Sequence, residues 1–500
     1  MNRRSLLLSA GALTLAGCAS SSPVRAREHP LATEFDAAVA QVMALNVSPG
    51  LAFAVFTADG TYARGLGVTD LETGERADAD TAFYIASSTK PLTALALTKL
   101  HHRGAFNLDM TLAEYAPDAP FPAAVRANEV RFRNMLSHTS GIDNGPIGYR
   151  SAFSGQHDPA TLWRLLAESE VNADAPLGTF DYTNVGYNIA TVLTDRGLGV
   201  QWQDLLDREV FAPLGMIRTS ARMSRAVAAG WRVAKPHEAL PSPERVYLEK
   251  TDQTMQSAGG VILSANDALR WLEAMVRGGQ LGSRQVIAPE VIAATREPLA
   301  QTSGDMMGFD RTTYGLGWFS GDHRGTTIYH HFGGFAGFAA HVSYMPERGV
   351  GVAVLSNGGG LGNVVIHTLA DYVYNRTGHD DADARFADAL EQRRGLIEQF
   401  RARGAADRAN RASREWRLSR ERAAYAGTYE SEAWGRIEVE ARGSDLIVQY
   451  GVMRATAEPF TQPDSIRVEL VPGTGEPIQF LGEGEQPSGL RTRGGAFERV

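Results

Sequence analysis

The sequence predicts an α+β fold followed by a small all-β domain. In residues 33–376, strand-like runs occur near both ends, whereas helical patches broken by Pro and Gly fill residues 90–250. This order differs from the regular strand–helix alternation of a parallel sheet, so we expect an antiparallel sheet. In residues 424–500, several runs alternate between apolar and polar residues, as strands with one buried face do.

The first predicted elements are a helix and a hairpin. The stretch TEFDAAVAQVMAL places Phe35, Val39 and Val42 on one face, which predicts an amphipathic helix. In GLAFAVFTADGTYARGLGVTD, two apolar, β-branched and aromatic runs flank Asp59-Gly60, which predicts a β-hairpin.

The end of the 33–376 unit carries more strands. SAGGVILSANDALRWLEAMVRGG reads as a short strand and then a helix capped by Ser264 or Asn266. Residues 326–356 contain three strand-like runs. We expect Gly333-Gly334 to separate the first two runs and the PERG stretch to separate the last two, which gives an antiparallel meander.

Residues 377–423 differ in composition from both neighbours. They contain many charged residues and few large apolar side chains, which predicts a solvated helical linker. This linker would join the 33–376 unit to the 424–500 β domain.

Composition excludes several functional classes. The chain has 500 residues, of which 43% are hydrophobic and 21% charged, as in an ordinary soluble globular protein. Its formal net charge is −8 and no long basic run occurs, so we expect no nucleic-acid partner. A single cysteine, Cys18, rules out an intrachain disulfide and a cysteine-based zinc site. No His-Glu-x-x-His or comparable spacing occurs, so we expect neither a metal nor a cofactor.

The N-terminus predicts export and a lipid anchor. Arg3 and Arg4 precede an apolar run that is too short to span a bilayer, and Leu15-Ala16-Gly17-Cys18 follows. This pattern resembles the bacterial lipobox, in which the cysteine is lipidated. We expect a signal peptide over 1–18, with Cys18 as the lipidation site.

Serine-rich residues after Cys18 predict a flexible tether over 19–32. The chain would then face the periplasm from a bacterial envelope membrane, the outer membrane if the source is Gram-negative. A plain secretory signal with a chance cysteine is the alternative, and the paired arginines also permit twin-arginine export.

Ser87 and Lys90 stand one helical turn apart where a helical pattern begins, in FYIASSTKPLTALALTKL. A serine hydroxyl becomes a good nucleophile only when a base removes its proton. Lysine can be that base if burial or nearby positive charge lowers its pKa, which arginine cannot do. Taken alone, Ser-x-x-Lys also arises by chance, and Ser87 or Ser88 would then be a helix cap.

Two further motifs follow in order along the chain. Tyr182-Thr183-Asn184 lies in a Gly-bounded loop, and His331-Phe332-Gly333 lies at the end of a predicted strand. Together with Ser87-x-x-Lys90, this ordered set resembles the serine β-lactamase and penicillin-binding protein family over residues 35–375. The resemblance is to its class-C-like branch, which also contains D,D-peptidases, D-aminopeptidases and esterases. It implies an antiparallel sheet flanked by helices, with an all-helical subdomain.

The resemblance implies roles for the catalytic residues. Ser87 would be the acylated nucleophile, and Lys90 would take its proton or tune the site electrostatically. Tyr182 would relay a proton to the leaving group, as a phenolate or through Lys90. Asn184 would bond the substrate amide or position Lys90. His138, in NMLSHTSGI, is expected to bond loop backbone instead.

The third motif would form the substrate-binding edge. The resemblance implies that Phe332, Gly333 and Gly334 line it, with the N–H groups of Ser87 and Gly334 as the oxyanion hole. His331 departs from the lysine that many β-lactamases carry here, and histidine is mostly neutral at pH 7. Substrate carboxylates should therefore bind more weakly, unless His331 acts as a hydrogen-bond donor. The alternative is a strand-end histidine without a role.

The resemblance implies a serine hydrolase that acts through an acyl-enzyme on a peptide, amide or ester in the cell envelope. Because of His331, peptidase or esterase action ranks above β-lactam hydrolysis. The substrate would be a small molecule or a peptide, including peptidoglycan-derived ones. A catalytically inactive peptidoglycan-binding or scaffold lipoprotein is the alternative.

Overall fold

The computed structural model describes residues 27–240 and 242–500. The predicted signal peptide, Cys18 and the first part of the tether lie outside these residues. Within the described ranges, no helix is both long and apolar enough to cross a membrane.

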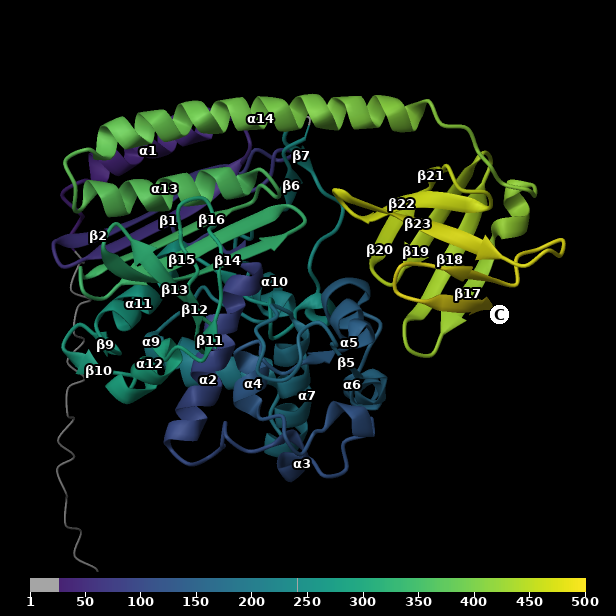
Figure 1. Cartoon of the computed structure of the whole chain (residues 1–500). Coiled ribbons are helices and arrows are strands. Elements are labelled where there is room, and N and C mark those ends of the chain that lie inside the picture. The colour runs from purple at the N-terminus through teal and green to yellow at the C-terminus, as the bar shows by residue number, and fades with distance from the viewer. Residues whose placement is uncertain (1–26, 241) are drawn as a thin grey trace, which may run out of the picture.

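An eight-stranded antiparallel sheet forms the centre of the first unit (Figure 1). Its strands in spatial order are β11 (Ala300–Gln301), β12 (Thr313–Tyr314), β13 (Phe319–His323), β14 (Thr326–Phe335), β15 (Phe338–Met345), β16 (Val350–Ser356), β1 (Gly50–Thr57) and β2 (Gly60–Gly67). The N-terminal hairpin β1–β2 thus joins the late strands, because β1 pairs with β16. The predicted antiparallel α+β fold is confirmed.

Helices cover both faces of this sheet. Ala52 and Ala54 of β1 belong to the core that includes α11 (Ala265–Val276), whose N-cap is Ser264 as predicted. Phe53 belongs to the opposite core. That core contains side chains of α1 (Ala32–Met43), α13 (Gly362–Arg376) and α14 (Ala382–Ala412). Alternate residues of one strand therefore serve two different cores, so both faces of the strand are buried.

The predicted turn at Gly333-Gly334 is wrong. Both glycines lie inside β14, paired with β15, and the chain turns at Ala336 and Gly337 instead. A Cβ at Gly333 would collide with the carbonyl oxygen of Ile85. Glycine is therefore needed here because another segment approaches the strand closely, a role that a turn glycine does not have.

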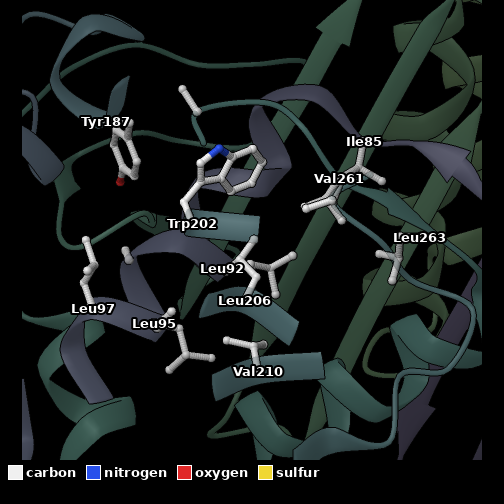
Figure 2. Packing of buried hydrophobic residues seen from close by; sticks show 14 of the residues in the cluster. Ile85, Leu92, Leu95, Leu97, Tyr187, Trp202, Leu206, Val210, Val261 and Leu263 are labelled. Atoms are coloured by element: carbon white, nitrogen blue, oxygen red, sulfur yellow. The ribbon is translucent and has the colours of Figure 1, made fainter. Parts of the chain in front are cut away.

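A helical subdomain fills the middle of the chain. Its helices are α2 (Lys90–His102), α3 (Leu112–Tyr115), α4 (Phe132–Leu136), α5 (Gly145–Tyr149), α6 (Pro159–Arg164), α7 (Val185–Leu198), α8 (Trp202–Leu206), α9 (Ala212–Leu214) and α10 (Met223–Ala228). α2 is buried on nearly all sides, and its Leu92 and Leu95 pack with Trp202 and Leu206 (Figure 2). The helix that begins beside Ser87 is thus a rigid core element.

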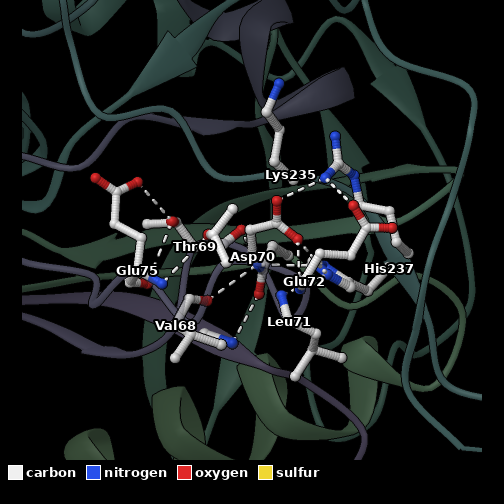
Figure 3. A network of polar contacts seen from close by, with 12 residues as sticks. Val68, Thr69, Asp70, Leu71, Glu72, Glu75, Lys235 and His237 are labelled. Atoms are coloured by element: carbon white, nitrogen blue, oxygen red, sulfur yellow. Dashed lines mark hydrogen bonds and ion pairs between the residues drawn. The ribbon is translucent and has the colours of Figure 1, made fainter.

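Short strands and one further helix complete the first unit. They are β3 (Phe83–Tyr84), β4 (Ile142–Asp143), β5 (Glu170–Val171), β6 (His237–Glu238), β7 (Glu244–Arg245), β8 (Ile262–Leu263), β9 (Gln280–Leu281), β10 (Arg284–Gln285) and α12 (Pro289–Arg296). A polar network ties the segment after β2 to β6 and β7 (Figure 3). In it, Arg245 donates to Asp70 at 2.6 Å, and the backbone N–H of Lys235 donates to the Thr69 carbonyl oxygen at 2.8 Å.

Residues 377–423 contain one long helix, α14. Its Phe386, Leu390 and Ile397 pack into the core that also contains side chains of α1 and α13, whereas the residues after Ile397 are mostly exposed. The predicted solvated linker is therefore helical, but its first half is part of a core. Figure 1 shows α14 extending from above α13 toward the C-terminal strands.

The C-terminal region is all-β, as predicted. Nine strands form one antiparallel sheet with β20 and β21 at its ends: β17 (Gly427–Ser431), β18 (Gly435–Arg442), β19 (Asp445–Tyr450), β20 (Met453–Thr456), β21 (Glu458–Pro459), β22 (Ser465–Val471), β23 (Thr474–Leu481), β24 (Gly489–Arg491) and β25 (Ala496–Arg499). β20 also contacts β22, so the sheet curls into a barrel-like shape.

This C-terminal sheet docks on the helical subdomain. The buried Arg150 donates to the carbonyl oxygen of Glu432 at 2.8 Å. The Gln156 side chain bonds both the N–H and the carbonyl of Arg436, at 2.7 and 2.9 Å. Leu248 enters the core of the C-terminal sheet. The contact is thus both apolar and hydrogen-bonded.

Candidate active site

Ser87 lies at the start of α2, in the 3-10 turn η1 (Ala86–Thr89) that follows β3. The preceding Ala86 has φ of 44°, which non-glycine residues rarely adopt and which occurs preferentially at functional sites. Every residue from 81 to 90 is buried except Ser87, which is partly exposed. Ser87 is therefore the residue of this segment that a substrate can reach.

Lys90 supports Ser87 from within the core. It is 0% exposed, and its Nζ lies 3.0 Å from Ser87 Oγ, 2.7 Å from Asn184 Oδ1 and 3.0 Å from the Ala258 carbonyl oxygen. Burial lowers the pKa of Lys90 well below its ordinary value. A neutral amine would donate to Asn184 and Ala258 and keep its lone pair for the Ser87 hydroxyl. This is the geometry of a general base.

Asn184 stands at the N-terminus of α7, but its side chain caps no backbone N–H of that helix. Instead Oδ1 accepts a hydrogen bond from Lys90. Of the two roles expected for Asn184, the geometry supports the positioning of Lys90.

Tyr182 lies on the other side of Ser87. Its ring centroid is 4.8 Å from Lys90 Nζ, and the residue is 39% exposed in the wall of the cavity. Desolvation of its hydroxyl among the surrounding side chains raises the pKa of Tyr182 to about 12, although the Ser87 side chain and the Arg311 charge oppose the rise. The resting group is therefore a phenol, not a phenolate.

His138 positions Tyr182. Its Nδ1 accepts a hydrogen bond from the backbone N–H of Thr183 at 3.3 Å, as expected for a residue that bonds loop backbone. Its ring packs 4.5 Å from that of Tyr182.

His331 is buried and neutral. It is 1% exposed, and burial, together with the charge of Lys90, lowers its pKa well below the ordinary value. Nδ1 lies 2.9 Å from the Phe332 carbonyl oxygen, so Nδ1 carries the proton. Nε2 then accepts from the Tyr314 hydroxyl, 3.4 Å away. His331 thus supplies no cation for a carboxylate.

The edge of β14 closes the site. Ser88 Oγ donates to the His331 carbonyl oxygen at 3.3 Å, which fixes η1 against this strand. The space beside Gly334 is open, since a Cβ there would meet nothing within 4 Å. A cavity of about 510 Å³ lies at this junction. Its lining includes Ser87, Tyr182, Arg311, His331, Phe332, Gly333 and Gly334. The structure therefore brings all three sequence motifs together.

A family model for beta-lactamase matches residues 35–375. The chain belongs to the beta-lactamase family. Penicillin-binding protein 4 of Amycolatopsis lactamdurans is 30% identical over 62% of this chain and 81% of that protein. The D-alanyl-D-alanine-carboxypeptidase/endopeptidase AmpH of Escherichia coli K12 is 24% identical over 71% of this chain and 91% of its own length. The unguisins hydrolase ungD of Aspergillus violaceofuscus is 25% identical over 66% of this chain, which spans only 61% of that protein.

Solved structures of this family share the fold. The octameric penicillin-binding protein homologue from Pyrococcus abyssi aligns with a TM-score of 0.59 at 19% identity, over 93% of this chain and 99% of that one. The D-amino acid amidase from Ochrobactrum anthropi SV3 aligns with a TM-score of 0.56 at 18% identity, over 72% and 99% of the two chains.

Arg311 is a cavity residue that the motifs did not reveal. It lies in the loop between β11 and β12, with its guanidinium 4.4 Å from the ring centroid of Phe319 and 5.2 Å from that of Phe332. Among the described residues, no carboxylate pairs with it and its Nε has no hydrogen-bond partner. Arg311 thus gives the β-lactamase-type cavity a free cation. Nothing in the local sequence distinguishes it from the many other arginines.

Within residues 27–240 and 242–500, no group of three or more His, Asp or Glu side chains is arranged to hold a metal ion.

Proposed function

We propose that this chain is a serine hydrolase that forms an acyl-enzyme at Ser87 on a peptide, amide or ester. One observation carries the proposal: a buried amine, which pairs with no carboxylate among the described residues, lies 3.0 Å from a partly exposed serine hydroxyl. Membership of the beta-lactamase family supports the same class of chemistry.

In the proposed reaction, Ser87 Oγ attacks the substrate carbonyl carbon while its proton passes to Lys90 Nζ. The N–H groups of Ser87 and Gly334 would stabilise the oxyanion that forms. Tyr182 then donates its phenolic proton to the leaving nitrogen or oxygen and recovers a proton from Lys90. Water attacks the resulting ester of Ser87, releases the carboxylic acid and restores the hydroxyl.

Peptides, amides and esters rank above β-lactams as substrates. The neutral His331 offers no positive charge at the position where many β-lactamases carry a lysine. Relatives named as a carboxypeptidase/endopeptidase, an amidase and the hydrolase EstCE1 agree with this order. Arg311 would instead hold a carboxylate of an acidic substrate from across the cavity.

Active-site labelling tests the proposal. Wild type and Ser87→Ala are incubated with a fluorophosphonate and with a penicillin, and adducts are mapped by mass spectrometry. We expect the fluorophosphonate on Ser87 in wild type and on no residue of the variant. If wild type carries neither label at Ser87, the serine-hydrolase proposal is wrong and the catalytically inactive scaffold protein remains as the alternative. A panel of D-amino acid amides, peptides and short-chain esters then narrows the substrate class.

We also propose that the N-terminus anchors the hydrolase to a bacterial envelope membrane through Cys18. The support is the sequence pattern Leu15-Ala16-Gly17-Cys18 behind a short apolar run. In a bacterial host, wild type should incorporate labelled palmitate and sediment with membranes. Cys18→Ala should do neither, while Ser21→Ala should behave as wild type. Equal labelling of wild type and Cys18→Ala would exclude the anchor.

A further inference from the structure

The helical subdomain contains a second cavity, larger than that at Ser87. Its volume is about 910 Å³, and it shares no lining residue with the cavity at Ser87. α6, α7, α8 and the loop around residues 252–257 form its walls. The proposed reaction uses none of these side chains.

Unpaired amides line this cavity. Asn188 is 3% exposed, and neither Nδ2 nor Oδ1 has a hydrogen-bond partner among the described residues. Gln256, which is 6% exposed, has no partner for Oε1 in the same set, and neither has Gln203. Buried polar atoms without partners are unfavourable, and a ligand with hydroxyl groups would satisfy them.

Both arginines of the lining already have a carboxylate partner. Arg222 pairs with Asp204 and Arg196 with Asp118, each at 2.6 Å. Burial raises the pKa of Asp195 to about 8, so this carboxyl is mostly protonated at neutral pH and can both donate and accept. The other two lining carboxylates each accept a hydrogen bond from a backbone N–H, Asp158 from Thr161 and Asp252 from Ser224, and among the described residues neither pairs with a cation. The lining therefore has no free cation for an anionic ligand, and its unpaired amides favour a neutral ligand with hydroxyl groups.

Apolar side chains form part of the wall. They include Leu162, Trp163, Val192, Val200 and Met255. The hydroxyls and amides that share the lining with them include Ser151, Asn188, Thr191, Gln203, Gln256 and Ser257. A sugar ring presents the matching surface, since its C–H groups are apolar and each hydroxyl both donates and accepts.

We propose that this cavity binds a neutral saccharide, with Asn188 and Gln256 as its main hydrogen-bonding residues. An extended peptide that adds a strand to a sheet fits less well because this mode of recognition needs a free strand edge. The lining consists instead of side chains from helices and loops.

The proposed saccharide site lies directly behind the catalytic lysine. Ser257 lines the cavity, and its Oγ hydrogen-bonds Thr191 Oγ1 at 2.8 Å. The next residue, Ala258, accepts from Lys90 Nζ at 3.0 Å. A bound saccharide would contact the segment that holds the amine in place.

Calorimetric titration of the full chain tests the proposal. The probes are maltotriose, cellotriose and tri-N-acetylchitotriose. We expect at least one to bind with Kd of about 1 mM or tighter. Asn188→Leu and Gln256→Leu should each weaken this binding by about tenfold or more, because each removes hydrogen-bonding groups from the wall. Gln449→Leu, a surface amide in β19, and Arg311→Ala, in the other cavity, should bind as wild type does.

Two outcomes would overturn the saccharide site. One is the absence of binding for all three probes up to about 10 mM, which would leave water as the occupant. The other is binding that Arg311→Ala abolishes and Asn188→Leu does not change. Thermal unfolding checks each variant, and Gln256→Leu decides alone if Asn188→Leu does not fold. The titration involves no hydrolysis, so its failure would leave the proposed function untouched.

Discussion

Two lysines are buried in this chain, one beside Ser87 and one at the junction with the C-terminal sheet. Lys90 is 0% exposed and Lys250 is 7% exposed. Burial lowers the pKa of both well below the ordinary lysine value. Among the described residues, neither forms an ion pair with a carboxylate.

Their neighbours differ in one decisive respect. Lys90 Nζ lies 3.0 Å from a serine hydroxyl, which can give up a proton. Lys250 Nζ donates to the Ala152 carbonyl oxygen at 2.7 Å and lies 3.4 Å from the ring centroid of Phe335. Carbonyl oxygens and ring faces have no proton to give, and ring faces favour a cation. Burial alone therefore does not make a base, since the neighbouring group decides what the amine can do.

The largest expected effect is a loss of catalytic activity when Lys90 is replaced, but not when Lys250 is replaced. Lys90→Met should lower kcat/KM by about 1,000-fold or more, since general-base assistance is worth about 10²–10⁴. Lys250→Met, the matched control, should stay within a few-fold of wild type. Hydrolysis of an activated ester by the purified proteins provides the measurement. Similar losses in both variants would remove the distinction between these sites.

Arg311, a third basic side chain that pairs with no carboxylate among the described residues, extends the comparison to substrate binding. Arg311→Ala should raise KM for a substrate with a free carboxylate by about 10–100-fold, the worth of a charged hydrogen bond. KM for a neutral ester should change little. Arg324→Ala, whose side chain pairs with Asp381 away from the Ser87 cavity, is the matched control. An equal rise in KM for both substrates would argue against carboxylate recognition.

The smallest expected effect is one that the two lysines share. In the unfolded state each amine is exposed and stays protonated up to its ordinary pKa of 10.5. In the folded state the pKa is lower, so the amine loses its proton at a lower pH. The free energy of unfolding should therefore rise with pH toward 10.5, by up to about 1.4 kcal/mol per unit for each lysine. Lys90→Met and Lys250→Met should each reduce this slope and stabilise the protein near pH 7. Urea unfolding from about pH 8 to pH 10 measures it, and an unchanged slope in Lys250→Met would mean that folded Lys250 keeps its proton.

Local spacing explains what the sequence predicts well. Ser87 and Lys90 are one helical turn apart, so their contact follows from the helix itself. The antiparallel sheet and the C-terminal strands follow from the period of apolar residues. The family resemblance predicts Tyr182, Asn184 and His331. The structure places Tyr182 and His331 in the wall of the Ser87 cavity and Asn184 against Lys90.

Features that depend on distant segments were missed. Gly333 looked like a turn residue because the sequence does not show that Ile85 approaches it in space. Arg311 reaches the cavity only through the loop between β11 and β12. The linker looked solvated because few apolar residues occur in it, yet Phe386, Leu390 and Ile397 are spaced to bury one side of its first half.

The pairing of β1 with β16 has a consequence for biosynthesis. Gly50 N–H bonds Asn357 Oδ1, 307 residues further along the chain, so the central sheet cannot close until almost the whole catalytic unit has been made. Contacts this distant in sequence slow folding. The strand edge beside Ser87 belongs to the same sheet, so a nascent or truncated polypeptide would carry the serine without a competent catalytic centre.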